Sequence, residues 1–290
     1  MQKILISGVT GFIGHNIAKE FYEKYSKYDI TIIGRKTKSW NDRLIKKNIK
    51  YIDLYKDNLE QLGKFDCIIH CAAILDNKKI DYPWNEYYNY NVLVLNKILN
   101  SIKFKRLIFI SSGSVFSSND SIPNPNNYYG LSKYVSEKIL EIFSLKSKIQ
   151  IIIIRFPIVI GLNSINNLVA MFAKRIFKNN PIEIYGNGQL KRNIIHIDEV
   201  VKIIVKLCFK KKYKNNIEII NAGSSSSMNI LDIALLIKKM LKSKSIINKI
   251  NKKRRANYNS KVNLNKIKKL LGYKPITTRK SIVKFINQKY

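Results

Sequence analysis

Short apolar segments alternate with longer amphipathic segments along most of the chain. The apolar segments lie near residue 4 and at residues 30–33, 51–52, 67–69, 107–110 and 151–154. This alternation is typical of βαβ units, in which parallel strands form a sheet with helices on both faces. The pattern therefore predicts an α/β fold built on a doubly wound parallel sheet.

The first apolar segment, Lys3–Ser7, leads directly into the glycine-rich segment Gly8–Gly14 and then into an amphipathic helix. Glycines at Gly8, Gly11 and Gly14 permit a tight turn and a close backbone approach, and a helix amino terminus offers free N–H groups to a pyrophosphate. We therefore predict a dinucleotide site on a Rossmann-type sheet. A plain chain reversal is the alternative. A signal peptide fits this start poorly because the glycines interrupt it and no small-residue cleavage site follows.

A second group of residues indicates proton transfer. Ser112 ends the apolar segment Leu107–Ile110, and Tyr129 and Lys133 follow with the spacing Tyr-x-x-x-Lys. On a helix these two side chains share a face, so the ammonium is expected to lower the pKa of the phenol. A tyrosine bonded to the same substrate oxygen as Ser112 can then give or take a proton near neutral pH. The alternative is a pair of exposed helix residues, since the chain is rich in both types.

The longest apolar stretch, Ile149–Leu162, is interrupted by Arg155 and Pro157 and is too short to span a bilayer. It is expected to be a buried parallel strand, and we predict a protein without membrane insertion.

The cysteines are few and odd in number: Cys67, Cys71 and Cys208. This usage favours a reducing cytoplasm over a disulfide framework. Cys67, His70 and Cys71 have metal-ligating side chains, but strand alternation would send Cys67 and His70 to opposite faces. We therefore predict packing cysteines and no metal site.

The charge is strongly basic, with 53 Lys and Arg against 19 Asp and Glu and a formal net charge of +34. Such a charge attracts nucleic acid or anionic surfaces nonspecifically. Most of the lysines are spread along the chain and accompany many isoleucines and asparagines, so we attribute the charge to compositional drift. The densest run, residues 249–255, is either a solvated loop or a polyanion patch. We predict no specific nucleic-acid binding.

The glycine spacing, the serine and the Tyr-x-x-x-Lys pair together resemble the extended short-chain dehydrogenase/reductase family, in particular its nucleotide-sugar epimerases, dehydratases and reductases. Further matching segments are Asp53-Leu54, Ile68–Ala73, Glu86–Val92, Arg155–Gly161, Asn166–Leu168, Ile184–Gly188 and Arg192–Val200. The resemblance implies a cytoplasmic homodimer with an NAD(P)-binding Rossmann domain at residues 1–161 and a smaller, discontinuous substrate lobe, mainly residues 162–290. Residues 184–197 and 217–221 are expected to return to the main sheet.

The resemblance also assigns site residues. The catalytic residues would be Ser112, Tyr129 and Lys133. Cofactor contacts would come from Gly8, Thr10, Gly11, Phe12, Ile13, Gly14, Arg35, Lys36, Asp53, Leu54, Cys71, Ala72, Ala73, Asn91, Tyr129, Lys133 and Phe156. Contacts to a nucleotide-diphosphate sugar would come from Ser112, Ser114, Asn167, Leu168, Tyr185, Arg192, Arg254 and Arg255.

Some of these substrate contacts have simpler alternatives. Arg192 resembles the family's diphosphate-binding arginine, but it could also be a surface residue, and Tyr185 could simply pack. Arg254 and Arg255 lie where relatives place a second phosphate-binding arginine. Ile158 departs from the pattern, because many relatives carry a substrate-contacting asparagine there.

The second apolar strand ends in Gly34-Arg35-Lys36, where NAD-preferring relatives carry an acidic residue for the ribose hydroxyls. A guanidinium there can bind a 2′-phosphate with its planar fork. We therefore predict NADP(H) over NAD(H). The alternative is that Arg35 stacks on adenine and either cofactor binds.

Departures from the family narrow the reaction. Gly113-Ser114 stands where the dehydratases carry an Asp-Glu pair, so the acid and base for loss of water are missing. Ser114 also replaces the cysteine of the epimerase-reductases that make fucose nucleotides. Two reactions remain. One is NADPH-dependent reduction of an NDP-4-keto-(6-deoxy)hexose, which Arg35 favours; the other is NAD-dependent 4-epimerisation of an NDP-hexose, which the segment Asn166–Leu168 favours.

Sequence alone favours the reductase narrowly. A noncatalytic nucleic-acid-binding or regulatory protein of the same fold is the remaining alternative. The intact Ser112, Tyr129 and Lys133 argue against it, because a binding module need not keep a proton relay.

Overall fold

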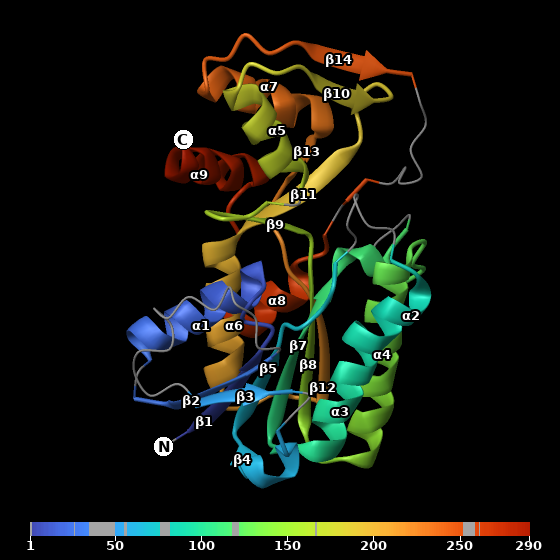
Figure 1. The fold of residues 1–290 in the computed structure, drawn as a ribbon, viewed down its shortest axis with the longest axis vertical. Coiled ribbons are helices and arrows are strands. Elements are labelled where there is room, and N and C mark those ends of the chain that lie inside the picture. The colour runs from blue at the N-terminus through green and yellow to red at the C-terminus, as the bar shows by residue number, and fades with distance from the viewer. Residues whose placement is uncertain are drawn as a thin grey trace. The chain divides into compact units, whose positions relative to one another are not determined.

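The computed structural model describes residues 2–25, 27–34, 50–54, 57–75, 82–117, 122–165, 167–251, 259–260 and 262–290. The chain forms two compact units (Figure 1). The first unit comprises residues 1–112, 127–155 and 201–220, and the second comprises residues 113–126, 156–200 and 221–290.

The first unit is built on a sheet of seven strands among the described residues, in the order β12-β8-β7-β5-β1-β2-β3. These strands are β1 (Lys3–Ser7), β2 (Asp29–Gly34), β3 (Lys50–Asp53), β5 (Cys67–His70), β7 (Arg106–Ser112), β8 (Gln150–Phe156) and β12 (Ile217–Asn221). The pairings from β3 across to β7 are parallel. The strand order reverses between β1 and β5, and ligands bind at such a switch point in doubly wound sheets.

Helices cover both faces of this sheet, as Figure 1 shows, with α1 (Phe12–Lys24) and α6 (Ile197–Phe209) on one face and α3 (Val94–Ser101) and α4 (Tyr128–Lys146) on the other. The rings of Phe21 and Phe209 join α1 to α6 with centroids 5.9 Å apart. The shorter elements that precede or connect these are η1 (Leu59–Leu62), β4 (Lys64–Phe65), α2 (Trp84–Tyr87), the π-helix η2 (Tyr88–Leu93) and β6 (Lys103–Phe104).

Strand composition explains the burial of the sheet. The four consecutive isoleucines at 151–154 in β8 are fully buried, as expected for a strand that is covered on both faces. Leu5, Ile68 and Leu107 belong to the same core cluster as residues of α3. Each such side chain contributes roughly 1.5–3 kcal/mol on burial.

The second unit has smaller sheets. Its elements are η3 (Gly113–Val115), β9 (Ile158–Ile160), α5 (Leu168–Phe177), β10 (Ile182–Tyr185), β11 (Lys191–His196), β13 (Ser227–Asn229), α7 (Ile230–Met240), β14 (Ile247–Ile250), α8 (Asn265–Leu271) and α9 (Thr278–Lys289). Strand β11 pairs in parallel with β9 and antiparallel with β13, while β10 pairs in parallel with β14. Helices α5, α7 and α9 supply much of its apolar core.

The predicted α/β fold is confirmed, but one prediction about the sheet is wrong. Residues 217–221 do form the edge strand β12 of the main sheet. Residues 184–197 do not return to it, because Ile194 pairs with Ile158 in the three-stranded sheet and Ile184 pairs with Lys249.

The predicted division at residue 161 also differs from the compact units. Residues 201–220 belong to the first unit, and residues 113–126 and 156–161 to the second. Contacts set this division: Phe209 of α6 packs on Phe21 of α1, and β9 pairs with β11. None of the helices in the described part of the chain is long and apolar enough to cross a membrane.

Candidate active site

The glycine-rich loop connects β1 to α1 at the switch point of the sheet. Gly8 has a φ of +72°, which L side chains rarely adopt, and the Gly11 amide donates to the Gly8 carbonyl at 3.0 Å. A Cβ placed on Gly8 would lie 2.5 Å from the amide nitrogen of Ala72, and one on Gly14 would collide with the Gly8 carbonyl. Gly8 and Gly14 are therefore required by close packing of the loop, the helix and the segment after β5, whereas a Cβ on Gly11 would lie 3.3 Å from the Gly8 carbonyl oxygen, a tight contact.

Ser7 holds the two loops of the switch point together. Its hydroxyl oxygen accepts hydrogen bonds from the amides of Cys71 and Ala72 at 3.1 and 3.3 Å. Thr10 and Gly11 are exposed at the start of α1, whose first turn carries no acidic side chain. A tight loop leading into an uncapped helix start suits a pyrophosphate, so the residues present fit a dinucleotide.

His70 is fully buried beside this loop, and its Nδ1 lies 2.8 Å from Ser7 Oγ. Because Ser7 Oγ already accepts two amides, its own hydrogen goes to Nδ1, and the neutral ring carries its proton on Nε2. Nε2 has no hydrogen-bond partner among the described residues. Burial, helped by the charge of Lys133, lowers the pKa of His70 to about 3.

The predicted catalytic residues come together in the first unit. Ser112 ends β7, and Tyr129 and Lys133 lie one turn apart on α4. The side chain of Asn127 starts this helix by accepting a hydrogen bond from the Gly130 amide at 2.8 Å. Tyr129 thus lies in the first turn, where the helix dipole favours a phenolate.

The protonation of Tyr129 differs from the sequence prediction. Burial raises its pKa to about 12, while its hydrogen bond with Ser112 opposes that shift. The expected lowering by Lys133 is absent, because the ammonium is engaged elsewhere. Lys133 Nζ donates to the Ile110 carbonyl at 2.8 Å and lies 4.6 Å from the centre of the Phe109 ring.

Lys133 itself is only 3% exposed. Burial lowers its pKa to about 8, and the carboxylate of Glu137 opposes this shift. This pKa lies close to neutral pH, so the fraction of Lys133 that is protonated there depends on the charges of its neighbours.

Asn91 supports the site from the π-helix η2, a kind of irregularity that often marks functional positions. Its side-chain amide donates to the Ile74 carbonyl at 3.1 Å and to Ser132 Oγ at 2.9 Å, and its oxygen accepts the Ile74 amide at 2.7 Å. Asn91 therefore joins the segment after β5 to the catalytic helix. Its buried side chain makes these contacts within the protein, so it supports the site rather than facing outward.

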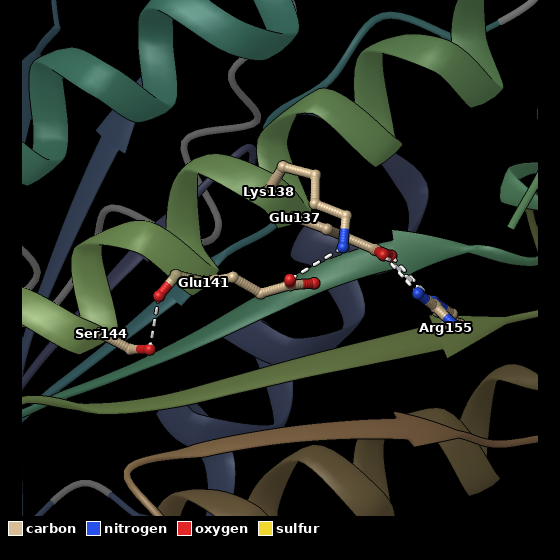
Figure 2. A network of polar contacts seen from close by, with 5 residues as sticks. All are labelled: Glu137, Lys138, Glu141, Ser144 and Arg155. Carbon is tan, nitrogen blue, oxygen red and sulfur yellow. Dashed lines mark hydrogen bonds and ion pairs between the residues drawn. The ribbon is translucent and has the colours of Figure 1, made fainter.

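A buried acid, Glu137, was missed by sequence reasoning. It follows Lys133 by four residues on α4 and binds Arg155 of β8 (Figure 2). Arg155, a guanidinium at the end of the apolar run Ile151–Ile154, was the available signal, whereas Glu137 lies among other polar residues of α4. Their pairing depends on tertiary structure.

The predicted substrate residues described in the second unit lie on several elements. Ser114 lies in η3, and Leu168 begins α5. Asn167 caps α5 by accepting the Ala170 amide at 2.9 Å. Tyr185 ends β10 with its hydroxyl 3.5 Å from Glu183 Oε2, and Arg192 of β11 donates to the Lys191 carbonyl at 3.0 Å.

The other predicted residues have simpler outcomes. Asp53 ends β3 and the buried Leu54 follows it, while the buried Phe156 ends β8. Four basic residues lie outside the described residues: Arg35, Lys36, Arg254 and Arg255.

Across the part of the chain that the structure describes, no three His, Cys, Asp or Glu side chains are placed to hold a metal ion. Cys67 and Cys208 are buried in the first unit, and Cys71 is half-buried.

Comparison with known proteins identifies the family. The model of the NAD dependent epimerase/dehydratase family matches residues 4–223. The chain belongs to this family. The UDP-glucose 4-epimerase of Vibrio cholerae is 30% identical over 220 residues, which cover 70% of this chain and 66% of that protein.

Two further relatives extend the comparison. The dTDP-D-glucose 4,6-dehydratase of Dictyostelium discoideum is 27% identical over 237 residues, so the match covers 69% of this chain but only 54% of that enzyme. A crystal structure of the UDP-glucuronic acid 4-epimerase of Bacillus cereus, in complex with UDP-glucuronic acid and NAD, has a TM-score of 0.84. It is 22% identical and covers 99% of this chain and 98% of its own, and it supports the fold.

The resemblance stated from the sequence is thus confirmed, and the expectation of an NAD(P)-dependent enzyme is confirmed at the level of the family, which uses a nicotinamide cofactor.

Proposed function

We propose that this protein is a nucleotide-sugar 4-epimerase that uses a tightly held nicotinamide cofactor. The arrangement of Ser112 hydrogen-bonded to Tyr129, with Lys133 one turn further along α4, carries the proposal of hydride transfer at a sugar hydroxyl. The choice of epimerisation is supported by the names of relatives such as the Vibrio cholerae enzyme. The Gly113-Ser114 segment, without a carboxylate pair, disfavours a dehydratase.

In this proposal the protein's residues handle the oxygen and its proton. Ser112 donates a hydrogen bond to the sugar oxygen and orients it toward Tyr129. Tyr129 removes the hydroxyl proton as the ketone forms and returns it when the alcohol is restored. When bound, the nicotinamide supplies the hydride acceptor and donor for the sugar carbon.

The raised pKa of Tyr129 sets a requirement on this chemistry. A phenol with a pKa of about 12 is a poor base near neutral pH, so binding of cofactor and sugar must bring the pKa down. Lys133 is the nearest source of positive charge on the same helix face, provided that it exchanges its bond to the Ile110 carbonyl for one nearer the phenol.

The cofactor loop would be Gly8–Gly14 together with Cys71, Ala72 and Ala73, because these segments pack backbone against backbone at the switch point. Arg192 is the proposed contact for the diphosphate, since a guanidinium binds such groups with two parallel hydrogen bonds. We further propose a cytoplasmic homodimer that has no specific nucleic-acid partner.

The second candidate is an NADPH-dependent reductase of a 4-keto nucleotide sugar. Gly34-Arg35-Lys36 favours it, since Arg35 replaces the acid expected for NAD. The two reactions differ in net cofactor consumption. A reductase consumes one NADPH for each product, whereas an epimerase returns the hydride to the sugar and consumes none.

Incubation with UDP-glucose in deuterated water tests the proposal. NMR of the sugar should show conversion to UDP-galactose with no deuterium at C4, because the same hydride leaves and returns. Stoichiometric loss of NADPH absorbance with a 4-keto nucleotide sugar, and no epimer from UDP-glucose or UDP-glucuronic acid, would instead establish the reductase. Deuterium at C4 of an epimer would rule out both hydride mechanisms.

A further inference from the structure

A buried ion pair lies directly behind the catalytic residues of the first unit. Glu137 is fully buried and Arg155 is 9% exposed. Arg155 Nε donates to both carboxylate oxygens of Glu137 at 3.0 and 3.2 Å, and its terminal nitrogen donates to Oε2 at 2.5 Å (Figure 2). Ser111 Oγ donates to Oε1 at 2.5 Å. The carboxylate therefore receives four hydrogen bonds from two strands.

These contacts join the elements that carry the proposed chemistry. Ser111 precedes Ser112 on β7, and Arg155 lies on β8, which is the neighbour of β7 in the sheet. Glu137 lies one helical turn beyond Lys133 and two turns beyond Tyr129 on α4. The three-way contact thus fixes the rotation and depth of α4 against the strand that ends in Ser112.

Stability alone is a weak explanation for such a pair. Removing two charges from water is costly, and replacement of buried ion pairs by apolar residues of similar volume is often neutral or stabilising. A neighbouring pair on the same helix shows the contrast. Lys138 and Glu141 form an ion pair at 2.8 Å on the solvent side, with side chains 49% and 31% exposed (Figure 2), where such pairs contribute little.

The surroundings of Lys133 explain what a buried acid can do there. Lys133 interacts electrostatically with three titratable groups: Cys71 after β5, His70 of β5 and Glu137 of its own helix. Cys71 has a pKa raised to about 12 by burial and so carries no charge near neutral pH. Buried His70 is neutral as well. Glu137 is therefore the anion that opposes the desolvation of the Lys133 ammonium.

We propose that Glu137 is a positioning residue: held by Arg155 and Ser111, its carboxylate fixes α4 against β7 and β8 and keeps Lys133 charged on the helix face that it shares with Tyr129. Its contribution to turnover rests on the proposed function, whereas its effect on the charge of Lys133 does not. Arg155 serves to hold the carboxylate in place.

The test measures the titration of Lys133 directly, by heteronuclear NMR of protein carrying isotopically labelled lysine. The Lys133 resonance is assigned by its loss in Lys133→Met. In Glu137→Gln the pKa of Lys133 should fall by about one unit, the order of shift caused by a nearby opposite charge. In the matched control Glu141→Gln, on the solvent side of the same helix, it should stay within about 0.3 units.

Turnover of the nucleotide sugar gives the second readout. Glu137→Gln should lower kcat roughly ten- to hundredfold, as misalignment of reacting groups does, with KM changed less than about twofold. The limb of the pH profile that reports Lys133 should move with its NMR titration. A folded Glu137→Gln with the parent's Lys133 titration would overturn the proposal, whatever its activity.

Glu137→Gln leaves Arg155 charged and buried, so a second variant protects the test against simple unfolding. The double variant Glu137→Met/Arg155→Met removes both charges and keeps the volume. If folded, it should show a lowered Lys133 pKa and reduced kcat. Parent values for both, or failure of both variants to fold, would assign the pair to stability alone and overturn the proposal. A parent without nucleotide-sugar turnover would refute the proposed function, while the NMR titration would still decide the role of Glu137.

Discussion

Substitution of Gly8 by alanine should disrupt the switch point of the sheet. Gly8 combines a φ of +72° with a position where a Cβ would lie 2.5 Å from the Ala72 nitrogen, 2.6 Å from its Cα and 2.7 Å from the Cys71 carbonyl carbon. All three neighbours are backbone atoms in the segment after β5. That segment is tied to Ser7 by two hydrogen bonds, so it cannot move without loss of those bonds.

Two costs add at this position. An L side chain in the left-handed region costs roughly 1–2 kcal/mol, and forcing a carbon into a packed site costs typically about 1–3 kcal/mol. We therefore expect Gly8→Ala to lower the free energy of unfolding of the first unit by about 2–5 kcal/mol. Dinucleotide affinity should fall as well, because the displaced loop carries the amides proposed to hold the pyrophosphate.

Gly63→Ala is the matched control. Gly63 has a similar φ of +75°, but a Cβ there would meet no atom within 4 Å. With a ψ of −159°, Gly63 lies in a region that essentially only glycine adopts, so Gly63→Ala should show the conformational cost alone, about 1–3 kcal/mol, and unchanged NADH binding. Urea denaturation followed by circular dichroism, with NADH titrations by fluorescence, gives both quantities. Equal destabilisation in the two variants, or NADH affinity retained in Gly8→Ala, would refute the close-approach argument.

Three further predictions concern individual side chains. Burial lowers the pKa of His70 from 6.5 to about 3, so the contribution of neutral His70 to the free energy of unfolding should be fully present above about pH 6.5. It should fall by roughly 4–5 kcal/mol as the pH drops toward 3. Urea denaturation at each pH should show this dependence in the parent and not in His70→Asn. Arg35→Ala should weaken NADPH binding by about 1.5–3 kcal/mol more than NADH binding if Arg35 holds a 2′-phosphate; equal losses by titration would assign it to adenine stacking. Arg192→Ala should reduce nucleotide-sugar binding in calorimetry and leave weak, salt-sensitive DNA binding unchanged, with Lys191→Ala as control; unaltered sugar binding would remove Arg192 from the site.

The parts of the site that sequence predicts are those encoded by local spacing. The turn at Gly8–Gly14 and the helix-face relation of Tyr129 to Lys133 each depend on a few neighbouring residues, and the structure contains both. The order of the apolar segments similarly predicts the sheet, because parallel strands buried on both faces need continuous apolar runs.

The parts that sequence missed depend on partners far along the chain. Glu137 and Arg155 are unremarkable as single charges, and their meaning comes from burial together. The pairing of β11 with β9 instead of the main sheet depends on which strands become neighbours when the chain folds, and the composition of a short apolar strand does not determine its partner. The pKa of Tyr129 was misjudged because the i, i+4 spacing places Lys133 on the right helix face but does not determine which acceptor its ammonium binds.

The central claim is that Tyr129 transfers the proton at the sugar oxygen. Its most direct test compares Tyr129→Phe with Tyr128→Phe, a neighbouring tyrosine that is 51% exposed, in conversion of UDP-glucose to UDP-galactose. Tyr129→Phe should lose at least ~10²-fold in kcat, as removal of a general acid–base group does, with NADH binding unchanged and Tyr128→Phe close to the parent. Turnover in Tyr129→Phe equal to that of the parent would contradict the account.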